Sequence, residues 1–272
     1  MKIKVVEGKV ACEKSVCAVW RKKKSRRDSS AALLLSFLFT LSAVFAEPLD
    51  LAGVGQAVTD VSELAAYDGV TNSSGGDPVT LTFDISSDME YAGKISGNIK
   101  LVKKGVGMLT LSGDNDYTGG TVIGGYDGST YTVGGRLRAN SLTAFGATTG
   151  AIQVNSDCQQ SQSDMESNKV TCVVFNAAGT FAYPINTSTW TTPANGPSGE
   201  AGKRQYNVAV TKRGTTLSGK ITGGGLSVHF GGLNWAANAA QPTGSGKLTI
   251  SGDIDCGEGA CPFGSWATEI HV

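Results

Sequence analysis

The most regular feature of the chain is an alternation of apolar and polar residues in short runs. In residues 79–85, VTLTFDI, every second residue is apolar and the residues between are threonine or aspartate. A period of two is typical of a strand that is buried on one side. Similar runs recur between residues 93 and 255, and glycine or asparagine stands between most of them. The pattern therefore predicts many short strands joined by tight turns over residues 71–272.

One segment has a different period. Between residues 49 and 66 the apolar residues recur mostly three or four positions apart, at Val54, Ala57, Val58, Val61, Leu64 and Ala65. This spacing predicts an amphipathic helix, with Asp50 capping its start and Gly69 ending it. We therefore expect residues 47–70 to form an N-terminal cap helix on an otherwise all-β chain.

Two parts of the chain repeat the same pair of elements in the same order. GKISG (93–97) precedes GMLTLSGDND (107–116), and GKITG (219–223) precedes GKLTISGDID (246–255). A longer insertion separates the two elements in the second copy. Residues 93–154 and the divergent copy 219–256 are thus predicted to be two versions of one unit, with variable loops such as 155–170 and 230–243.

The first 46 residues differ from the rest in charge. Ten of the 23 Lys and Arg residues lie in residues 1–30 with only three of the 23 acids, and the uncharged run AALLLSFLFTLSAVFA follows at 31–46. This order predicts a secretory signal peptide over residues 1–46, with an extended basic segment and cleavage between Ala46 and Glu47. The alternative is an uncleaved anchor, although a membrane-spanning helix needs roughly 20 residues. The remainder has 13 basic and 20 acidic residues, a balance that disfavours binding to nucleic acid.

The cysteines agree with export. Beyond the signal they are Cys158, Cys172, Cys256 and Cys261, an even number that suits an oxidising compartment. Four cysteines allow three connectivities, and we favour the two local pairs, 158 with 172 and 256 with 261, because each closes a short loop. No C-x-x-C occurs, and His229 and His271 do not stand at ligand spacing, so no metal or other cofactor is expected.

The motif in residues 93–154 resembles the passenger-associated repeat of bacterial autotransporters. The residues on the pattern include Gly105, Gly107, Leu109, Leu111, Gly113, Tyr117, Gly119 and Gly120. The resemblance implies a right-handed parallel β-helix, with roughly 20 to 25 residues in each coil and on the order of ten coils. In this fold Leu109 and Leu111 would face inward, Thr110 and Ser112 outward, and Gly113 would turn the corner. Met108, where the family usually has threonine, is a departure at the level of one side chain.

The resemblance also implies a function. It describes a structural and adhesive passenger that is exported to the cell surface, the outer membrane or the extracellular space, and that is not an enzyme. Its expected partner is a protein or glycan on a host or neighbouring cell. Contact with the outer membrane is expected only through a translocator barrel, which these residues do not contain.

Acidic residues provide the alternative reading. Asp114 and Asp116 follow the first repeat strand, and Asp253, Asp255 and Glu258 follow the second. Clustered carboxylates can cleave glycans, so a secreted β-helix carbohydrate-active enzyme, a lyase or glycosidase, is the alternative function, and weak calcium binding is a third possibility. Because both clusters lie in glycine-rich turns of a repeated unit, we favour a role in the turns themselves.

Three tryptophans fall in loop-like surroundings, at Trp190, Trp235 and Trp266. An exposed tryptophan can anchor a partner or a sugar ring. It can equally fold a loop down onto the solenoid, which is the interpretation that we favour.

Overall fold

The computed structural model describes residues 46–126, 131–155, 170–187, 207–223, 228–230 and 247–255, together with four short strands outside these ranges. The chain forms two compact units, 1–45 and 46–272. In the first unit, β1 (Lys4–Val6) pairs antiparallel with β2 (Lys9–Ala11), and the predicted apolar core of the signal lies outside the described residues. In the described part of the chain, no helix has the length and apolar character needed to span a bilayer.

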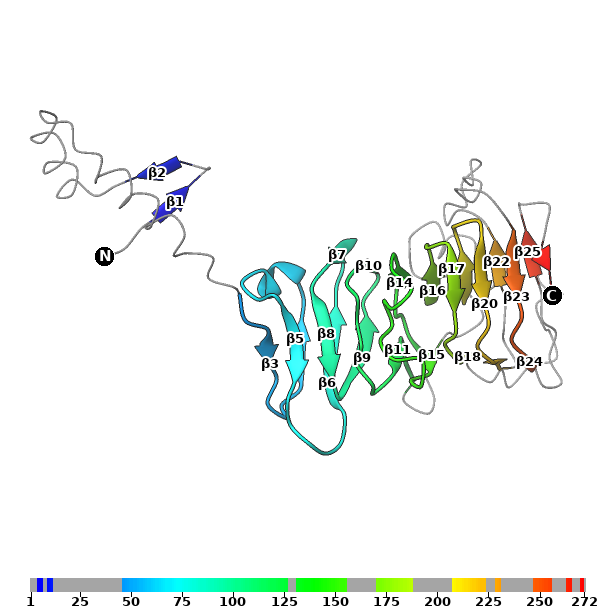
Figure 1. Ribbon diagram of the computed structural model, residues 1–272, viewed down its shortest axis with the longest axis horizontal. Helices are drawn as coiled ribbons and strands as arrows, with labels where there is room; N and C mark the ends of the chain where they lie inside the picture. The colour runs from blue at the N-terminus through cyan, green and yellow to red at the C-terminus, as the bar shows by residue number, and fades with distance from the viewer. Residues whose placement is uncertain are drawn as a thin grey trace, which may run out of the picture. The chain divides into compact units, whose positions relative to one another are not determined.

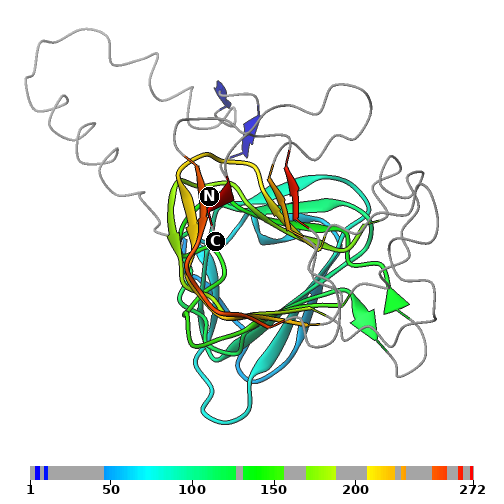
Figure 2. The ribbon, with the colours of Figure 1, turned by 90° about the vertical axis from the view of Figure 1, so that its right-hand side faces the viewer.

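The second unit is a parallel β-helix with three faces (Figures 1 and 2). The first face is an eight-stranded sheet of β4 (Gln56–Val58), β6 (Val79–Asp84), β9 (Ile99–Lys104), β11 (Thr121–Ile123), β15 (Ile152–Val154), β18 (Ile185–Thr187), β21 (Ile221–Thr222) and β24 (Ile254–Asp255). The second is a seven-stranded sheet of β7 (Met89–Tyr91), β10 (Met108–Leu111), β14 (Arg136–Ala139), β16 (Cys172–Phe175), β19 (Val208–Val210), β22 (Val228–Phe230) and β25 (Phe263–Ser265). The predicted all-β solenoid is therefore confirmed.

The third face is interrupted. It begins with β3 (Leu49–Asp50), β5 (Gly69–Asn72) and β8 (Lys94–Gly97), and it resumes with β17 (Gly179–Phe181), β20 (Thr215–Leu217), β23 (Leu248–Ile250) and β26 (Ile270–His271). Between these two sheets, segments 112–120 and 140–151 complete the third side of their coils without forming strands. In each full coil the chain passes from the third face to the eight-stranded sheet and then to the seven-stranded sheet.

The coils from β11 onward are longer than those before it. Val79 pairs with Ile99, twenty residues later, whereas Thr121 pairs with Ile152, 31 residues later. Only residues 105–107 separate β9 from β10, but residues 155–171 separate β15 from β16. The eight-stranded sheet accordingly marks eight coils in the part of the chain that the structure describes, in agreement with the expected number on the order of ten.

Many of the added residues enter at one edge of the solenoid. Along the chain, the eight-stranded sheet is connected to the seven-stranded sheet through the hairpin of β12 (Gly125–Tyr126) and β13 (Tyr131–Thr132) and, in later coils, through segments 155–171, 188–207 and 256–262. We call this border the insertion edge. Residues 156–169 of the predicted variable loop 155–170 and residues 231–243 of the predicted loop 230–243 lie outside the described residues.

The predicted N-terminal cap helix is not formed. Residues 47–70 instead make a first coil of β3, β4 and a single 3-10 turn, η1 (Val61–Leu64). Ala52 and Gly53 adopt φ angles of 48° and 86°, which an α-helix does not allow. The apolar spacing serves the coil instead, because Val58 and Leu64 are buried whereas Val54 is 70% exposed.

The two proposed helix ends have other roles. The carboxylate of Asp50 accepts hydrogen bonds from the backbone N–H groups of Ala52 and Ser73, which joins the first coil to the second. Gly69 begins β5 rather than ending a helix. The true cap in this segment is a capping box, in which the side chains of Asp60 and Glu63 bind the backbone of the 3-10 turn.

The core is a set of inward-facing stacks. As predicted, β6 alternates buried and less buried residues along VTLTFD. Register places Leu81, Leu101, Thr121, Ile152 and Ile185 at equivalent positions of successive strands. Neighbouring strands lie about 4.8 Å apart, so each stack is a continuous row of contacts along the axis.

Candidate interaction surface and the repeat that builds it

The glycines of the repeat allow adjacent coils to approach closely. Gly105 has a φ of 74°, and a Cβ added there would collide with the carbonyl oxygen of Ile85 in the preceding coil. A Cβ at Gly113 would lie 2.5 Å from the carbonyl oxygen of Gly93. Any other residue would push these two corners of the coil apart.

The repeat strand behaves as predicted on its inner side only. Leu109 and Leu111 are fully buried. Thr110 points to the outer side, as predicted, but it is 7% exposed and not open to solvent, and Ser112 is half-buried. The outer side of the seven-stranded sheet is therefore partly covered.

Lys103 is a motif residue whose role the sequence did not reveal. Its side chain is fully buried, and Nζ donates to the carbonyl oxygens of Lys104, Gly105 and Gly134. The bonds to Gly105 and Gly134 are both 3.0 Å long, and Gly134 belongs to the next coil. Burial lowers the pKa of Lys103 to about 8. The amino group therefore clamps two coils together at the insertion edge.

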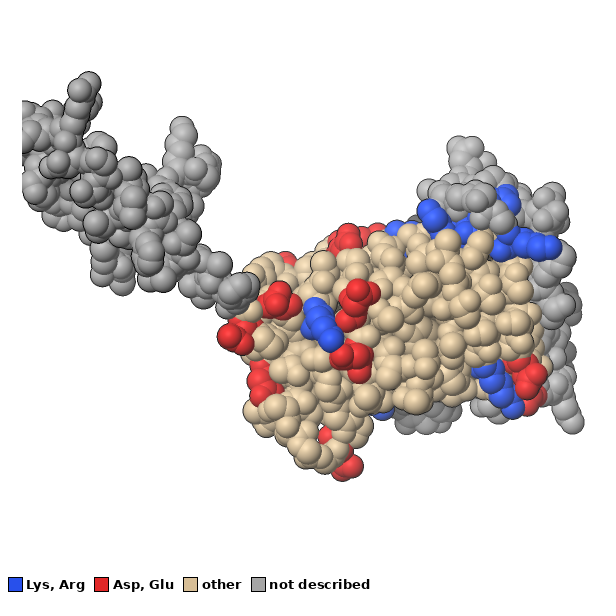
Figure 3. Space-filling model, in the orientation of Figure 1, with Lys and Arg blue, Asp and Glu red and all other residues tan. Residues whose placement is uncertain are grey.

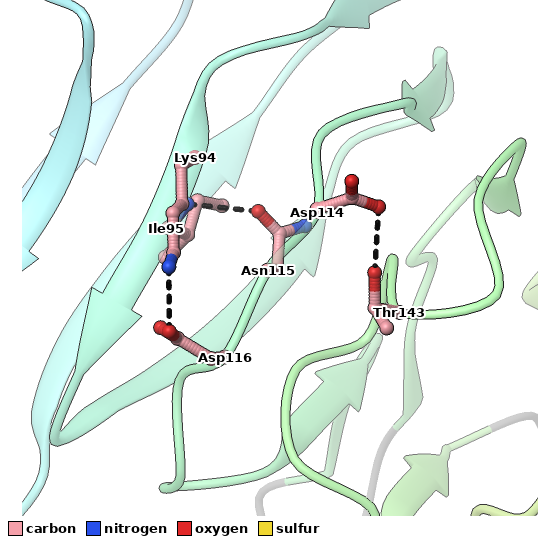
Figure 4. A network of polar contacts seen from close by, with 6 residues as sticks. All are labelled: Lys94, Ile95, Asp114, Asn115, Asp116 and Thr143. Carbon is pink, nitrogen blue, oxygen red and sulfur yellow. Dashed lines mark hydrogen bonds and ion pairs between the residues drawn. The ribbon is translucent and has the colours of Figure 1, made fainter.

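Asn115 and Tyr117 bridge the gap in the third face. The Asn115 side chain accepts a 2.8 Å hydrogen bond from the N–H of Ile95 (Figure 4). It also donates a 2.6 Å bond to the carbonyl of Ala144. It thus links β8 to segment 140–151, where no strand ladder is present. Tyr117 is fully buried, its carbonyl accepts a 2.9 Å hydrogen bond from the N–H of Ala147 in the next coil, and its hydroxyl lies 2.6 Å from Thr121 Oγ1.

The first acidic cluster is divided between different partners. Asp114 accepts hydrogen bonds from the hydroxyls of Ser141 and Thr143, at 2.8 and 2.9 Å, and these bonds lower the pKa of its carboxyl. Asp116 pairs with Lys94 at 2.6 Å (Figure 4). The two carboxylates therefore bind different neighbours instead of converging on a common site.

The second cluster is similar where it is described. Asp255 lies 3.9 Å from Lys220, and Glu258 lies outside the described residues. Among the residues that the structure describes, no three His, Cys, Asp or Glu side chains are grouped so as to hold a metal ion.

The second copy of the repeat lies one face further round the solenoid than the first. Ile95 of the first copy is on the third face, whereas the equivalent Ile221 is in the eight-stranded sheet. Likewise Leu109 is in the seven-stranded sheet and Leu248 is on the third face. The ion pair between Lys94 and Asp116 nevertheless recurs between Lys220 and Asp255. The repeating unit is therefore a set of strands and turns that can occupy different faces.

The outer side of the seven-stranded sheet carries both charged and apolar residues. The two register rows on this side contain Asp88 and Glu90, Met108 and Thr110, Arg136 and Arg138, and Cys172 and Val174. Val170, Cys172, Val174 and Ala209 form a small buried cluster separate from the main core. This side thus passes from acidic through basic to apolar along the axis.

Cys172 has a free, buried thiol in the structure, and burial raises its pKa to about 12. Cys158, Cys256 and Cys261 lie outside the described residues, so the two disulfides stay predictions. Trp190, Trp235 and Trp266 lie outside them as well. Ala46 and Glu47 are exposed, and cleavage between them stays a prediction.

Acidic residues gather over the first coils (Figure 3). Residues 47–93 contain nine Asp or Glu and no Lys or Arg. Lys94 is the first basic residue after this segment, and basic side chains recur from there on. The N-terminal end of the solenoid therefore repels anions, whereas the later coils can attract them.

Parts of the sequence are similar to known proteins. Residues 101–125 match the passenger-associated-transport-repeat family. The chain is 29% identical over 192 residues to the adhesin BmaC autotransporter of Brucella suis biovar 1 (strain 1330). That alignment covers 68% of this chain and 5% of the relative, so the chain spans only a small part of the length of that protein. No solved structure matches the chain. The resemblance to bacterial autotransporter passenger domains that carry the passenger-associated transport repeat is thereby confirmed.

Proposed function

We propose that the chain is an adhesive and structural segment of an exported, surface-displayed passenger. The β-helix would hold its outer faces and insertion edge away from the cell, where they contact a protein or glycan of a host or neighbouring cell. The observation that carries this proposal is the passenger repeat folded into a parallel solenoid, together with the similarity to an autotransporter adhesin.

The described side chains of the repeat serve the fold, and this supports a binding role for the chain. Residues of the repeat such as Leu109, Lys103 and Asn115 pack in the core or form hydrogen bonds between coils. The described acids of the repeat turns, Asp114 and Asp116, bind Ser141, Thr143 and Lys94. By contrast, the connection between the eight-stranded and the seven-stranded sheets differs in length from coil to coil, from residues 105–107 to residues 155–171. Connections of variable length suit a surface adapted to a partner.

An adhesion assay tests the proposal. Beads coated with the purified chain are expected to adhere to cultured epithelial cells, and soluble chain should compete for the same sites. The matched control is the Leu109→Asp variant, which places a charge in the core and should unfold the solenoid. Adhesion that is equal for the two proteins, or absent from both, would contradict an adhesive role for the folded chain.

A further inference from the structure

Two arginines on the outer side of the seven-stranded sheet lie side by side. Arg136 and Arg138 are two residues apart on β14, so their side chains leave the same side of the sheet. Register places Met108 and Thr110 beside them on one flank and Cys172 and Val174 on the other. The pair therefore occupies the middle of this surface.

The guanidinium groups are incompletely satisfied. The Nε atoms of Arg136 and Arg138 are both buried and have no hydrogen-bond partner in the part of the chain that the structure describes. Arg136 is only 9% exposed. Its Nη2 lies 3.7 Å from Asp88 Oδ2, a separation too long for a hydrogen bond.

Keeping these two adjacent guanidinium groups charged and partly buried is energetically unfavourable unless an anion is bound. Burial, and then the neighbouring positive charge of Arg136, lower the pKa of Arg138. On the far flank the buried cluster of Val170, Cys172, Val174 and Ala209 supplies no charge to balance the pair. Asp88 and Glu90 lie two strands away on the same side, and each favours the charged form of Arg138. Two adjacent, partly desolvated cations with unused donors are suited to an oxyanion, which a guanidinium binds through paired N–H groups.

We propose that Arg136 and Arg138 form a subsite for the sulfate or carboxylate group of an anionic glycan. This inference rests on the proposed adhesive function and names the chemical class of its ligand. Arg138, the more exposed of the two, receives the group first, and Arg136 binds it from the deeper side.

Site-specific arginine labelling tests the subsite in the full chain. Phenylglyoxal modification of each arginine is followed by mass spectrometry with a heparin-derived tetrasaccharide, a hyaluronan tetrasaccharide or neutral dextran present. We expect the two anionic probes, but not dextran, to protect Arg138 and Arg136, whereas Arg213 on another part of the solenoid keeps its rate. The first probe carries sulfate and carboxylate and the second carboxylate alone, so the two distinguish the sources of the oxyanion.

Variants of the same full chain give the affinity. Arg136→Gln combined with Arg138→Gln should weaken binding of the protecting tetrasaccharide by about tenfold or more, since hydrogen bonds to charged groups are lost. Arg138→Lys keeps the positive charge but removes the planar guanidinium group with its paired N–H donors, and should give an intermediate affinity. Lys220→Gln removes one positive charge elsewhere and should change affinity little. The ten basic residues of segment 1–30 are the same in every variant, so they do not affect the comparison.

Three results would overturn the subsite. These are no protection by either anionic probe, unchanged affinity in the double variant, or arginines that are already unreactive in the free chain because its own carboxylates fill the position. Bead adhesion separates this inference from the proposed function. Adhesion that persists without anion binding removes only the subsite, whereas anion binding at the arginines without adhesion to cells removes the adhesive function.

Discussion

Lys103 shows that a charged residue can be part of the core of this solenoid. Its ammonium group has three donors, and three backbone carbonyls of two coils accept them. The lowered pKa, about 8, still leaves the group mostly protonated at neutral pH. The lysine of the repeat is therefore a structural residue rather than a surface charge.

Replacing this lysine should destabilise the fold. Lys103→Met keeps the length of the side chain but leaves carbonyls of Gly105 and Gly134 without their donor, which costs about 1–3 kcal/mol for a buried polar group. Urea denaturation measures the free energy of unfolding. The control is Lys104→Met at the exposed neighbouring position, which should change that energy by less than about 0.5 kcal/mol. A Lys103→Met protein as stable as the parent would show that the clamp is dispensable.

Asp114 should make the stability of the fold depend on pH. The hydroxyls of Ser141 and Thr143 lower the pKa of its carboxyl below the ordinary value of 3.8, so the folded state favours the charged form. Asp114 contributes its full stabilisation when the pH is above the pKa that its carboxyl has in the unfolded chain. This stabilisation is lost as the pH falls through the lower pKa of the folded state.

We therefore expect Asp114→Asn to be less stable than the parent at pH 7, and the difference to shrink as the pH approaches 2. Urea denaturation at several pH values measures this change. Asp77→Asn, at an exposed loop position, serves as the matched control and should leave the stability at pH 7 unchanged. A difference that stays constant with pH would mean that charge on Asp114 is irrelevant to the turn.

At the scale of elements, the gap in the third face is closed by side chains together with isolated backbone hydrogen bonds, such as those from the Asp116 N–H to the Ile95 carbonyl and from the Ala147 N–H to the Tyr117 carbonyl. Asn115 supplies the acceptor and the donor that a strand backbone would have offered to Ile95 and Ala144. Tyr183 continues the same work in the next coil, because its hydroxyl donates to the carbonyls of Leu142 and Gly146. The stack of coils is therefore continuous although the sheet is not.

Asn115→Leu tests this bridge. The substitution leaves the N–H of Ile95 and the carbonyl of Ala144 buried without partners, and we expect a loss of about 2 kcal/mol or more in the free energy of unfolding. Amide hydrogen exchange should accelerate at Ile95 first. Thr118→Ala, in the same segment but exposed, is the control and should leave exchange at Ile95 unchanged. Unaltered protection of Ile95 in Asn115→Leu would refute the bridge.

The strands were predictable because a period of two survives in runs such as β6 and β9, and because most inward positions, such as Leu81 and Leu109, are apolar. The helix over residues 49–66 was wrong because spacings of three and four also arise when a short coil turns its apolar residues inward. The positive φ angles of Ala52 and Gly53 decide between the two, and periodicity carries no information about them.

The surface was less predictable than the core. The neighbours of Asn115 and Arg138 depend on which residues of adjacent coils share a register, and the coils differ in length by unequal insertions. Arg136 and Arg138 are two ordinary arginines in the sequence. Only the pairing of β14 with β10 and β16 shows which side chains stand next to them.

At the scale of the whole molecule, export is the step on which display depends. The basic segment 1–30 and the apolar run 31–46 still predict cleavage before Glu47. N-terminal sequencing of the chain recovered outside the cytoplasm should read Glu47-Pro48-Leu49. Ala46→Arg should block processing and leave the longer form, whereas Ser42→Ala, within the apolar run, should not. A recovered chain that begins at Met1 would favour the uncleaved anchor.

The displacement of the second repeat by one face has a consequence for how such a chain can change. If a strand and its turn fit any face, duplication of that small piece would rotate every later residue by a third of a revolution about the axis. A side chain on one flank would then reappear on the next, while the stacks of the interior remain filled. The direction in which a motif is presented could therefore evolve separately from the length of the solenoid.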